Sequence, residues 1–212
     1  EMLAFGETHD ISAFAVKSFG SIGRELGAGT GLGEDLLQEH YPVGVESDLH
    51  GAISSVLLKA AAATEDPCFF PEFAIRHPSN ENAFLLWHAS APLSLKNPSE
   101  KQLRFEPPWI RKGSPPKTAG FRLKDGPLTM CRFDGDTGGY RLGIGEGRTV
   151  EGPATKENYL WAEVEDWKRW EFALMKGPYI HHCSAIHEHC VEVLKTAAEY
   201  IPGVEIEEWG RS

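Results

Sequence analysis

The sequence has few cysteines and no long hydrophobic run. Its 212 residues include four Cys, too few for a disulfide scaffold, so a reduced cytoplasmic protein is the expectation. No apolar stretch is long enough to span a bilayer, and the first residues lack the basic and apolar regions of a secretory signal. The sequence therefore predicts neither a membrane-embedded protein nor a small secreted disulfide domain.

Positive charge is also scarce. Lys and Arg number 21 against 31 Asp and Glu, and the net charge of −10 argues against nucleic acid or an anionic membrane as a partner. The run "GAGTGLGED" (27–35) lacks the Lys-Ser/Thr of a phosphate loop and the spacing of a dinucleotide fingerprint, so it predicts a plain turn. The remaining composition is that of an ordinary globular protein with one large or two small domains.

The first part of the chain alternates between strand-like and helix-like segments. Strands are predicted at 11–19, 42–47, 67–75 and 83–90, and helices at 33–41 and 48–63. Asp48 directly precedes the second helical pattern and is a predicted N-cap. This alternation is typical of a layered α/β unit, so residues 1–92 are predicted to form part of a Rossmann-like α/β domain.

The character of the sequence changes beyond this region. Residues 91–117 hold six prolines without a regular period, which predicts a linker or surface loop at 93–118. Residues 119–212 contain short alternating runs separated by turns, with helical patterns at 164–177 and 187–203. We therefore expect a small antiparallel β-barrel-like domain with flanking helices, and an α+β fold overall.

The segment "GPYIHHCSAIHEHC" (177–190) is rich in potential metal ligands. A local zinc site is disfavoured, because no CxxC pair is present and a helix here would place Cys190 on its apolar face. His181 and His182 differ from the rest, since they follow a Gly-Pro turn and precede a predicted helix. They could face a cleft or simply lie in a surface loop.

Carboxylates occur at the ends of predicted strands. Glu46 and Asp48 follow one strand, Glu72 lies in an apolar strand, and His88 ends the next. Ligands bind at strand ends in open α/β sheets, and a buried carboxylate needs a cation or a metal. The set suggests a hard divalent site for Mn²⁺ or Mg²⁺, although Glu72 could flank an edge strand and His88 could hydrogen-bond within a core.

Several motifs occur in an order that resembles a known family. They are "VGVESDLHGAISSVLLKAA", "CFFPEFAIRHPSNENAFLLWH", "GPLTMCRF", "GGYRLGIGEG" and "GPYIHHC". Together they resemble the C-terminal half of the L-fucose isomerase-like proteins, relatives of L-fucose and L-arabinose isomerases. The resemblance implies a middle α/β domain followed by a small β-barrel-like domain.

The resemblance also implies roles for individual residues. Glu46 matches the first metal-binding and proton-shuttling acid, and Glu72 matches the second. His182 matches the histidine ligand near the C-terminus. His88 matches a histidine ligand of the arabinose branch, and we expect it to be a fourth ligand or a donor to a sugar oxygen.

The implied activity is aldose–ketose isomerisation with Mn²⁺ or another divalent cation, through an enediolate between C2 and C1 of an open-chain sugar. His181 and Trp87 are candidate substrate contacts, although packing is the simpler role for Trp87. Two alternatives stay open: a non-catalytic or partner-requiring domain, and a metal-dependent lyase or epimerase. Family members are longer and oligomeric, so a homo-oligomer, or a partner chain that supplies the N-terminal region, is expected.

Overall fold

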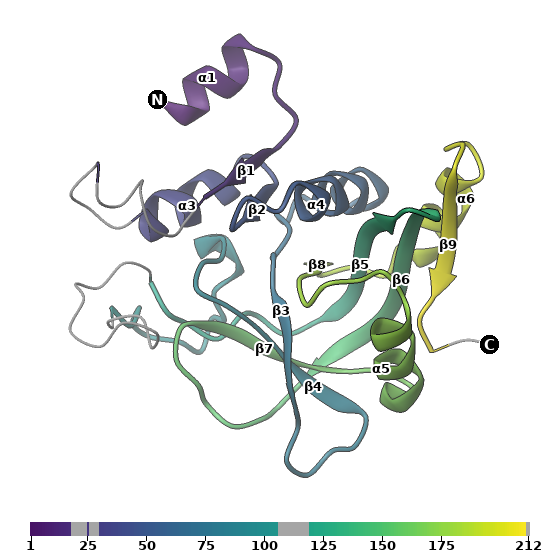
Figure 1. Ribbon diagram of the computed structural model, residues 1–212. Coiled ribbons are helices and arrows are strands. Elements are labelled where there is room, and N and C mark those ends of the chain that lie inside the picture. The colour runs from purple at the N-terminus through teal and green to yellow at the C-terminus, as the bar shows by residue number, and fades with distance from the viewer. Residues whose placement is uncertain (18–24, 26–29, 106–118, 211–212) are drawn as a thin grey trace.

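The computed structural model describes residues 1–17, 25, 30–105 and 119–210, and it confirms the α+β class (Figure 1). The elements in chain order are α1 (Met2–Thr8), β1 (Phe14–Val16), α3 (Gly31–Gln38), β2 (Val43–Val45), α4 (Leu49–Ala61), β3 (Glu72–Arg76), β4 (Ala83–His88), the 3-10 turn η1 (Leu93–Leu95), β5 (Pro127–Asp136), β6 (Gly139–Val150), β7 (Asn158–Glu163), α5 (Trp167–Lys176), β8 (Ser184–Ile186), α6 (Val191–Ala198) and β9 (Val204–Glu208). The predicted strand at 11–19, the turn at 27–35 and the linker at 93–118 each fall partly outside the described residues.

A small unit near the N-terminus contains the two parallel strands β1 and β2, with Phe14 opposite Val43. Both strands are short and apolar, as expected for parallel strands that helices cover. The helix α4 begins as predicted, because the Asp48 side chain accepts a hydrogen bond from the Gly51 N–H at 2.8 Å. Its N-terminal end therefore lies directly after β2, where the two candidate carboxylates are.

The other described strands form one larger sheet in the order β3-β4-β7-β6-β5-β8, and β9 pairs with β6. The described strands do not close into a barrel, which corrects the barrel-like expectation. The two ends of the sheet are nevertheless joined, since isolated bridges connect Phe69 with Ala185 and Glu72 with His182. The strand β8 has only three residues, too few for a continuous closing ladder.

The strands β3 and β4 belong to this larger sheet and not to the parallel pair. They pair antiparallel with each other, and β4 pairs with β7 so that Ala83 lies opposite Glu163. Segments on both sides of residues 93–118 therefore share one sheet. The predicted divisions at 1–92, 93–118 and 119–212 stay predictions, and residues 106–118 lie outside the described part of the chain.

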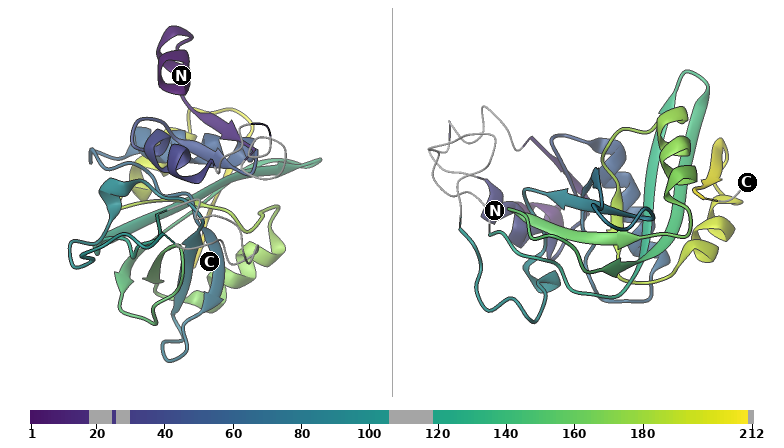
Figure 2. Two further views of the ribbon diagram at one scale, coloured as in Figure 1. Left: turned by 90° about the vertical axis from the view of Figure 1, so that its left-hand side faces the viewer. Right: turned by 90° about the horizontal axis from the view of Figure 1, so that it is seen from below.

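The helices α5 and α6 pack beside the larger sheet (Figures 1 and 2). The helix α5 begins after the Asp166 cap and ends at Gly177, as predicted. The helix α6 begins at Val191 and not at 187, because the chain first forms β8 and a turn. The helix α1 projects away from the rest of the molecule (Figure 2). No helix in the described ranges combines the length and apolar character needed to cross a membrane.

Candidate metal centre

Four side chains from distant parts of the chain converge at one point. One ligand atom from each of Glu46, Glu72, His88 and His182 lies within 4.8 Å of the others. Ligand atoms bound at about 2.1 Å from one ion lie at most about 4.2 Å apart. The four side chains are therefore close to the spacing that a single divalent ion requires.

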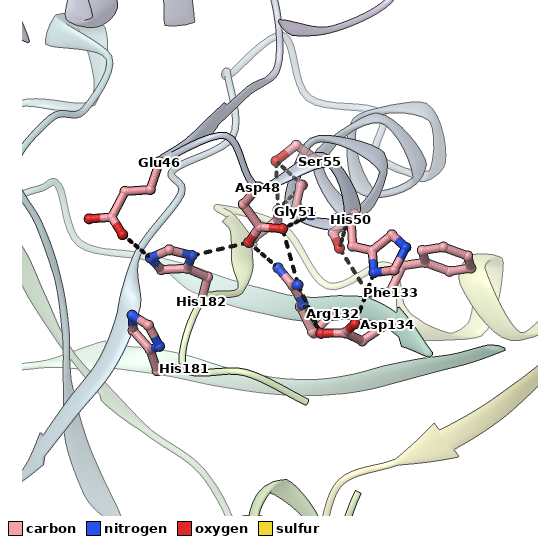
Figure 3. A network of polar contacts seen from close by, with 12 residues as sticks. Glu46, Asp48, His50, Gly51, Ser55, Arg132, Phe133, Asp134, His181 and His182 are labelled. Atoms are coloured by element: carbon pink, nitrogen blue, oxygen red, sulfur yellow. Dashed lines mark hydrogen bonds and ion pairs between the residues drawn. The ribbon is translucent and has the colours of Figure 1, made fainter. Parts of the chain in front are cut away.

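Glu46 stands in an unusual turn between β2 and α4. The backbone of Glu46 and Ser47 is left-handed, with φ of 63° and 65°. Left-handed residues other than Gly cost about 1–3 kcal/mol each and cluster at functional sites. Hydrogen bonds hold this turn, from the Ser47 N–H to the Val16 carbonyl and from the Asp48 N–H to the Val45 carbonyl. The turn directs the Glu46 carboxylate toward His182 (Figure 3).

Glu72 and His182 are register partners in one of the bridges that join the ends of the sheet. The His182 Nε2 atom lies 3.9 Å from an oxygen of Glu46 and 3.9 Å from an oxygen of Glu72. The His182 side chain is only 3% exposed, and its Nε2 atom has no hydrogen-bond partner within the part of the chain that the structure describes. A buried ring nitrogen without a partner is costly, and a metal ion between the carboxylates would satisfy it. These residues therefore fit a divalent ion.

The electrostatics of the cluster favour proton-accepting chemistry. Burial raises the pKa of Glu72, a protonated His182 lowers it, and the Glu46 charge raises it again. Burial, together with any positive charge on His182 or His181, lowers the pKa of His88 to about 3. His88 is therefore neutral near pH 7, and a neutral imidazole can bind a metal or donate a hydrogen bond.

A charged network lies behind His182, and the sequence analysis missed it (Figure 3). The Asp48 carboxylate contacts the His182 Nδ1 atom at 3.0 Å and accepts two hydrogen bonds from Arg132. Arg132 also donates to Asp134, whose other oxygen lies 2.9 Å from the His50 Nδ1 atom. The available signal was the opposite charges of Arg132 and Asp134 in one strand, because residues two apart share a face.

Both aspartates of this network are held in the ionised form. Burial alone would raise the pKa of Asp48, but hydrogen bonds from His182 and Arg132 hold it well below its usual value. Burial also opposes ionisation of Asp134, and the His50 contact and the Arg132 charge together lower its pKa. Arg132 is itself almost completely buried, so these carboxylates also stabilise its charge.

The other two predicted site residues lie at the edge of the cluster. The His181 side chain is 57% exposed, and its Nε2 atom lies 3.9 Å from an oxygen of Glu72. Trp87 lies opposite Glu72 in the β3–β4 register, and both line a surface cavity of about 300 Å³. The Trp87 indole N–H donates to the Lys156 carbonyl at 2.8 Å, and the ring packs beside Leu85. Contact of His181 or Trp87 with a substrate stays a prediction.

The remaining residues of the histidine-rich segment do not share a metal position. The Nε2 atom of His187 lies 2.9 Å from the Lys124 carbonyl, and that of His189 lies 2.9 Å from the Gly147 carbonyl. Cys190 is buried in a hydrophobic cluster. Among the residues that the structure describes, the group able to hold one ion contains none of these three. The expectation against a local zinc site stays a prediction.

Comparisons with known proteins place this chain near a group of sugar isomerases. Residues 115–208 match the family described as L-fucose isomerase, C-terminal domain. The sulfoquinovose isomerase of Alkalicoccus urumqiensis is 27% identical over 150 residues, which cover 68% of this chain and 32% of that protein. The sulfoquinovose isomerases of Priestia aryabhattai and Priestia megaterium are each 25% identical over 195 residues, covering 88% of this chain and 43% of theirs. The chain spans less than half the length of these relatives.

Proposed function

We infer that this chain, an L-fucose isomerase-like protein, carries the metal-binding centre of an aldose–ketose isomerase. The observation that carries the proposal is the convergence of Glu46, Glu72, His88 and His182 around the unpartnered Nε2 atom of His182. Two carboxylates and imidazole nitrogens suit Mn²⁺ or a similar divalent cation. When bound, such an ion would polarise the sugar carbonyl, which acidifies the neighbouring C–H.

One of the two carboxylates would move the proton between carbon atoms, and the other, Glu46, would serve as a metal ligand. Glu72 is the proposed proton acceptor, because it lies beside Trp87 on the cavity that a sugar could enter. In the aldose-to-ketose direction, its carboxylate would take the proton from C2, leaving an enediolate, and the resulting carboxyl would return the same proton to C1. A further proton moves between the two sugar oxygens, so the carboxylate is regenerated at the end of each turnover.

His88 has two candidate roles, and one contact favours the second. The Ser90 N–H donates to the His88 Nδ1 atom at 3.4 Å. A neutral imidazole that accepts at Nδ1 carries its proton on Nε2. We therefore propose His88 as a hydrogen-bond donor to a sugar oxygen, with Glu46, Glu72 and His182 as the metal ligands.

The Glu46→Gln change tests the metal site directly. Replacing this carboxylate by an amide removes a charged ligand, and we expect Mn²⁺ binding and turnover to be abolished. Isothermal titration with Mn²⁺ measures the first, and NMR detection of ketose from a panel of aldoses, sulfoquinovose included, measures the second. Glu205→Gln, a matched change on β9 at a side chain that is 76% exposed, is the control. Mn²⁺ binding by Glu46→Gln equal to that of the control contradicts the assignment.

The same NMR experiment separates the alternative reactions. A ketose with an unchanged carbon skeleton supports the isomerase. A C2 epimer supports an epimerase, and cleavage fragments support a lyase on the same centre. Metal binding without any product supports a metal-binding domain that lacks activity on its own.

We also propose that a second surface covers this site. The Glu46 and Glu72 side chains are 29% and 25% exposed, whereas isomerases that form an enediolate exclude water from it. A second copy of this chain or another protein segment would supply the cover. Turnover that rises more steeply than protein concentration is the expected sign of such assembly.

A further inference from the structure

We propose that Asp48 and Arg132 are positioning residues that fix His182 in one tautomer, with the proton on Nδ1 and a free lone pair on Nε2 facing the metal position. Neither residue belongs to the group of described side chains whose ligand atoms converge on one position. The inference deepens the proposed function and rests on it, because the lone pair serves a purpose only if the site binds a metal.

The Asp48 carboxylate contacts nitrogen atoms on both of its oxygens. Its Oδ1 atom accepts from the Gly51 N–H at 2.8 Å and from Arg132 Nη2 at 3.1 Å. Its Oδ2 atom accepts from Arg132 Nη1 at 2.5 Å and lies 3.0 Å from the His182 Nδ1 atom. An ionised carboxylate offers about four acceptor positions, so these four contacts fill it.

The other contacts of Asp48 determine which atom donates in the hydrogen bond between Asp48 and His182. Arg132 keeps its proton in proteins, and the Gly51 backbone group can only donate. The carboxylate is therefore ionised and has no hydrogen to offer, so the His182 Nδ1 atom must be the donor. In the neutral ring the Nε2 atom then carries the lone pair, and this atom lies 3.9 Å from both Glu46 and Glu72.

Buried hydrogen bonds hold the Asp48 carboxylate in place beside His182. Arg132 on β5 donates to Asp134 through Nε at 3.0 Å and Nη2 at 2.8 Å. The same guanidinium also donates to Asp48. Asp48 in turn caps α4. The side chains of Asp48, Arg132 and His182 are 9%, 2% and 3% exposed, so water does not compete for these contacts. The guanidinium thus joins the start of α4 to the long strand β5 and fixes the carboxylate that orients the ring.

His88 provides an internal contrast. Its Nδ1 atom faces the Ser90 N–H donor where that of His182 faces a carboxylate. The two rings are therefore expected to carry their protons on opposite nitrogens. A generic effect of burial would act on both rings alike, whereas the Asp48 contact acts on His182 alone.

The test uses the metal-free protein and the Asp48→Asn change. At about pH 8, above the usual histidine pKa, long-range ¹H–¹⁵N spectra with the His182 signal assigned should show the Nδ1–H form for His182 and the Nε2–H form for His88. An asparagine amide can donate to Nδ1, so Asp48→Asn should shift His182 toward the Nε2–H form and leave His88 unchanged. Isothermal titration should then show Mn²⁺ affinity about 10–100-fold lower. Asp166→Asn makes the same change at the α5 cap and should alter neither result.

The outcomes separate this inference from the function it rests on. A wild-type spectrum with His182 protonated on Nε2 overturns the inference, even if Asp48→Asn does not fold. An Asp48→Asn protein that folds and keeps both the tautomer and the affinity overturns it as well. If the wild-type protein binds no Mn²⁺, the proposed function fails, while the wild-type and Asp48→Asn spectra still decide whether Asp48 sets the tautomer.

Discussion

Two buried aspartates contact the His182 ring and the loop after His88, and their pKa values are shifted in opposite directions. Asp48 contacts His182 and is paired with Arg132, so its pKa lies well below the usual value. Asp35 on α3 holds the loop after His88 by accepting from the Ala91 N–H, and it also accepts from the Ala119 N–H. Burial, added to the charges of nearby glutamates, raises its pKa to about 8 against the effect of these two N–H groups.

The difference shows that burial alone does not decide the charge of an aspartate. Both carboxyl groups lose most of their hydration, yet among the described residues Asp48 has a guanidinium in contact and Asp35 does not. The His182 side of the site is therefore a network of fixed charges. The His88 side contains hydrogen bonds between uncharged groups, such as the contact from the Gln38 amide to the Ser90 hydroxyl at 3.1 Å.

Removing the buried Arg132 guanidinium should have the largest effect on stability. Arg132→Met leaves two buried carboxylates without the guanidinium that balances their charge, and we expect a loss of about 3–5 kcal/mol in the free energy of unfolding. Urea denaturation measures it. Arg148→Met, which removes an exposed ion pair with Glu163, should have little effect. Equal losses in the two variants would mean that the network carries no special weight.

A methyl group at Gly51 should disturb the same side of the site through packing. An added Cβ would lie 2.7 Å from the Asp48 Oδ2 atom and closer still to the Phe70 ring. We expect Gly51→Ala to cost about 1–3 kcal/mol in stability and to weaken Mn²⁺ binding. A Cβ added at Gly33 in α3 would have no atom of another described residue within 4 Å. Gly33→Ala should therefore stabilise the folded protein by about 0.5–1 kcal/mol. Thermal unfolding distinguishes these opposite signs.

The pH dependence of stability should reveal the charge state of Asp35, on the His88 side of the site. Asp35 has a folded pKa of about 8 against about 3.9 unfolded, so between these values the folded state holds the extra proton. Stability should therefore fall as the pH rises, by at most about 1.4 kcal/mol per pH unit. Asp35→Asn should remove this part of the slope in urea denaturation at pH 6 and 7. An unchanged slope would show that Asp35 is already ionised in the fold.

Much of the local structure followed from the sequence pattern. Apolar spacing and capping residues located α4 and α5, and apolar runs located β3 and β4. The pattern did not reveal which strands pair, because period-two alternation is the same in any antiparallel sheet. It also extended α6 too far toward its N-terminus, since residues 184–186 form β8 through contacts with β5 and with Phe69.

The strand-end positions suggested Glu46, Glu72 and His88 as candidate ligands, and the family resemblance added His182 to this set. Nothing in the local sequence showed that Glu46 and His182 approach within 3.9 Å, since that contact depends on the tertiary fold. The role of Asp48 was half predicted: its cap is a local property, but its contact with Arg132 joins residues 84 positions apart. Asp35 gave no signal, because an acidic residue on a short helix is ordinarily exposed.

The bridge between Glu72 and His182 has a consequence for how the molecule is made. The ring of His182 meets Asp48 across 134 positions of chain, and it does so where the first and last strands of the larger sheet come together. Such distant pairings carry a large loop-closure cost and are slow to form. During synthesis the centre would stay incomplete until the final segments dock, so a nascent or truncated chain would hold its carboxylates without the imidazole that completes them.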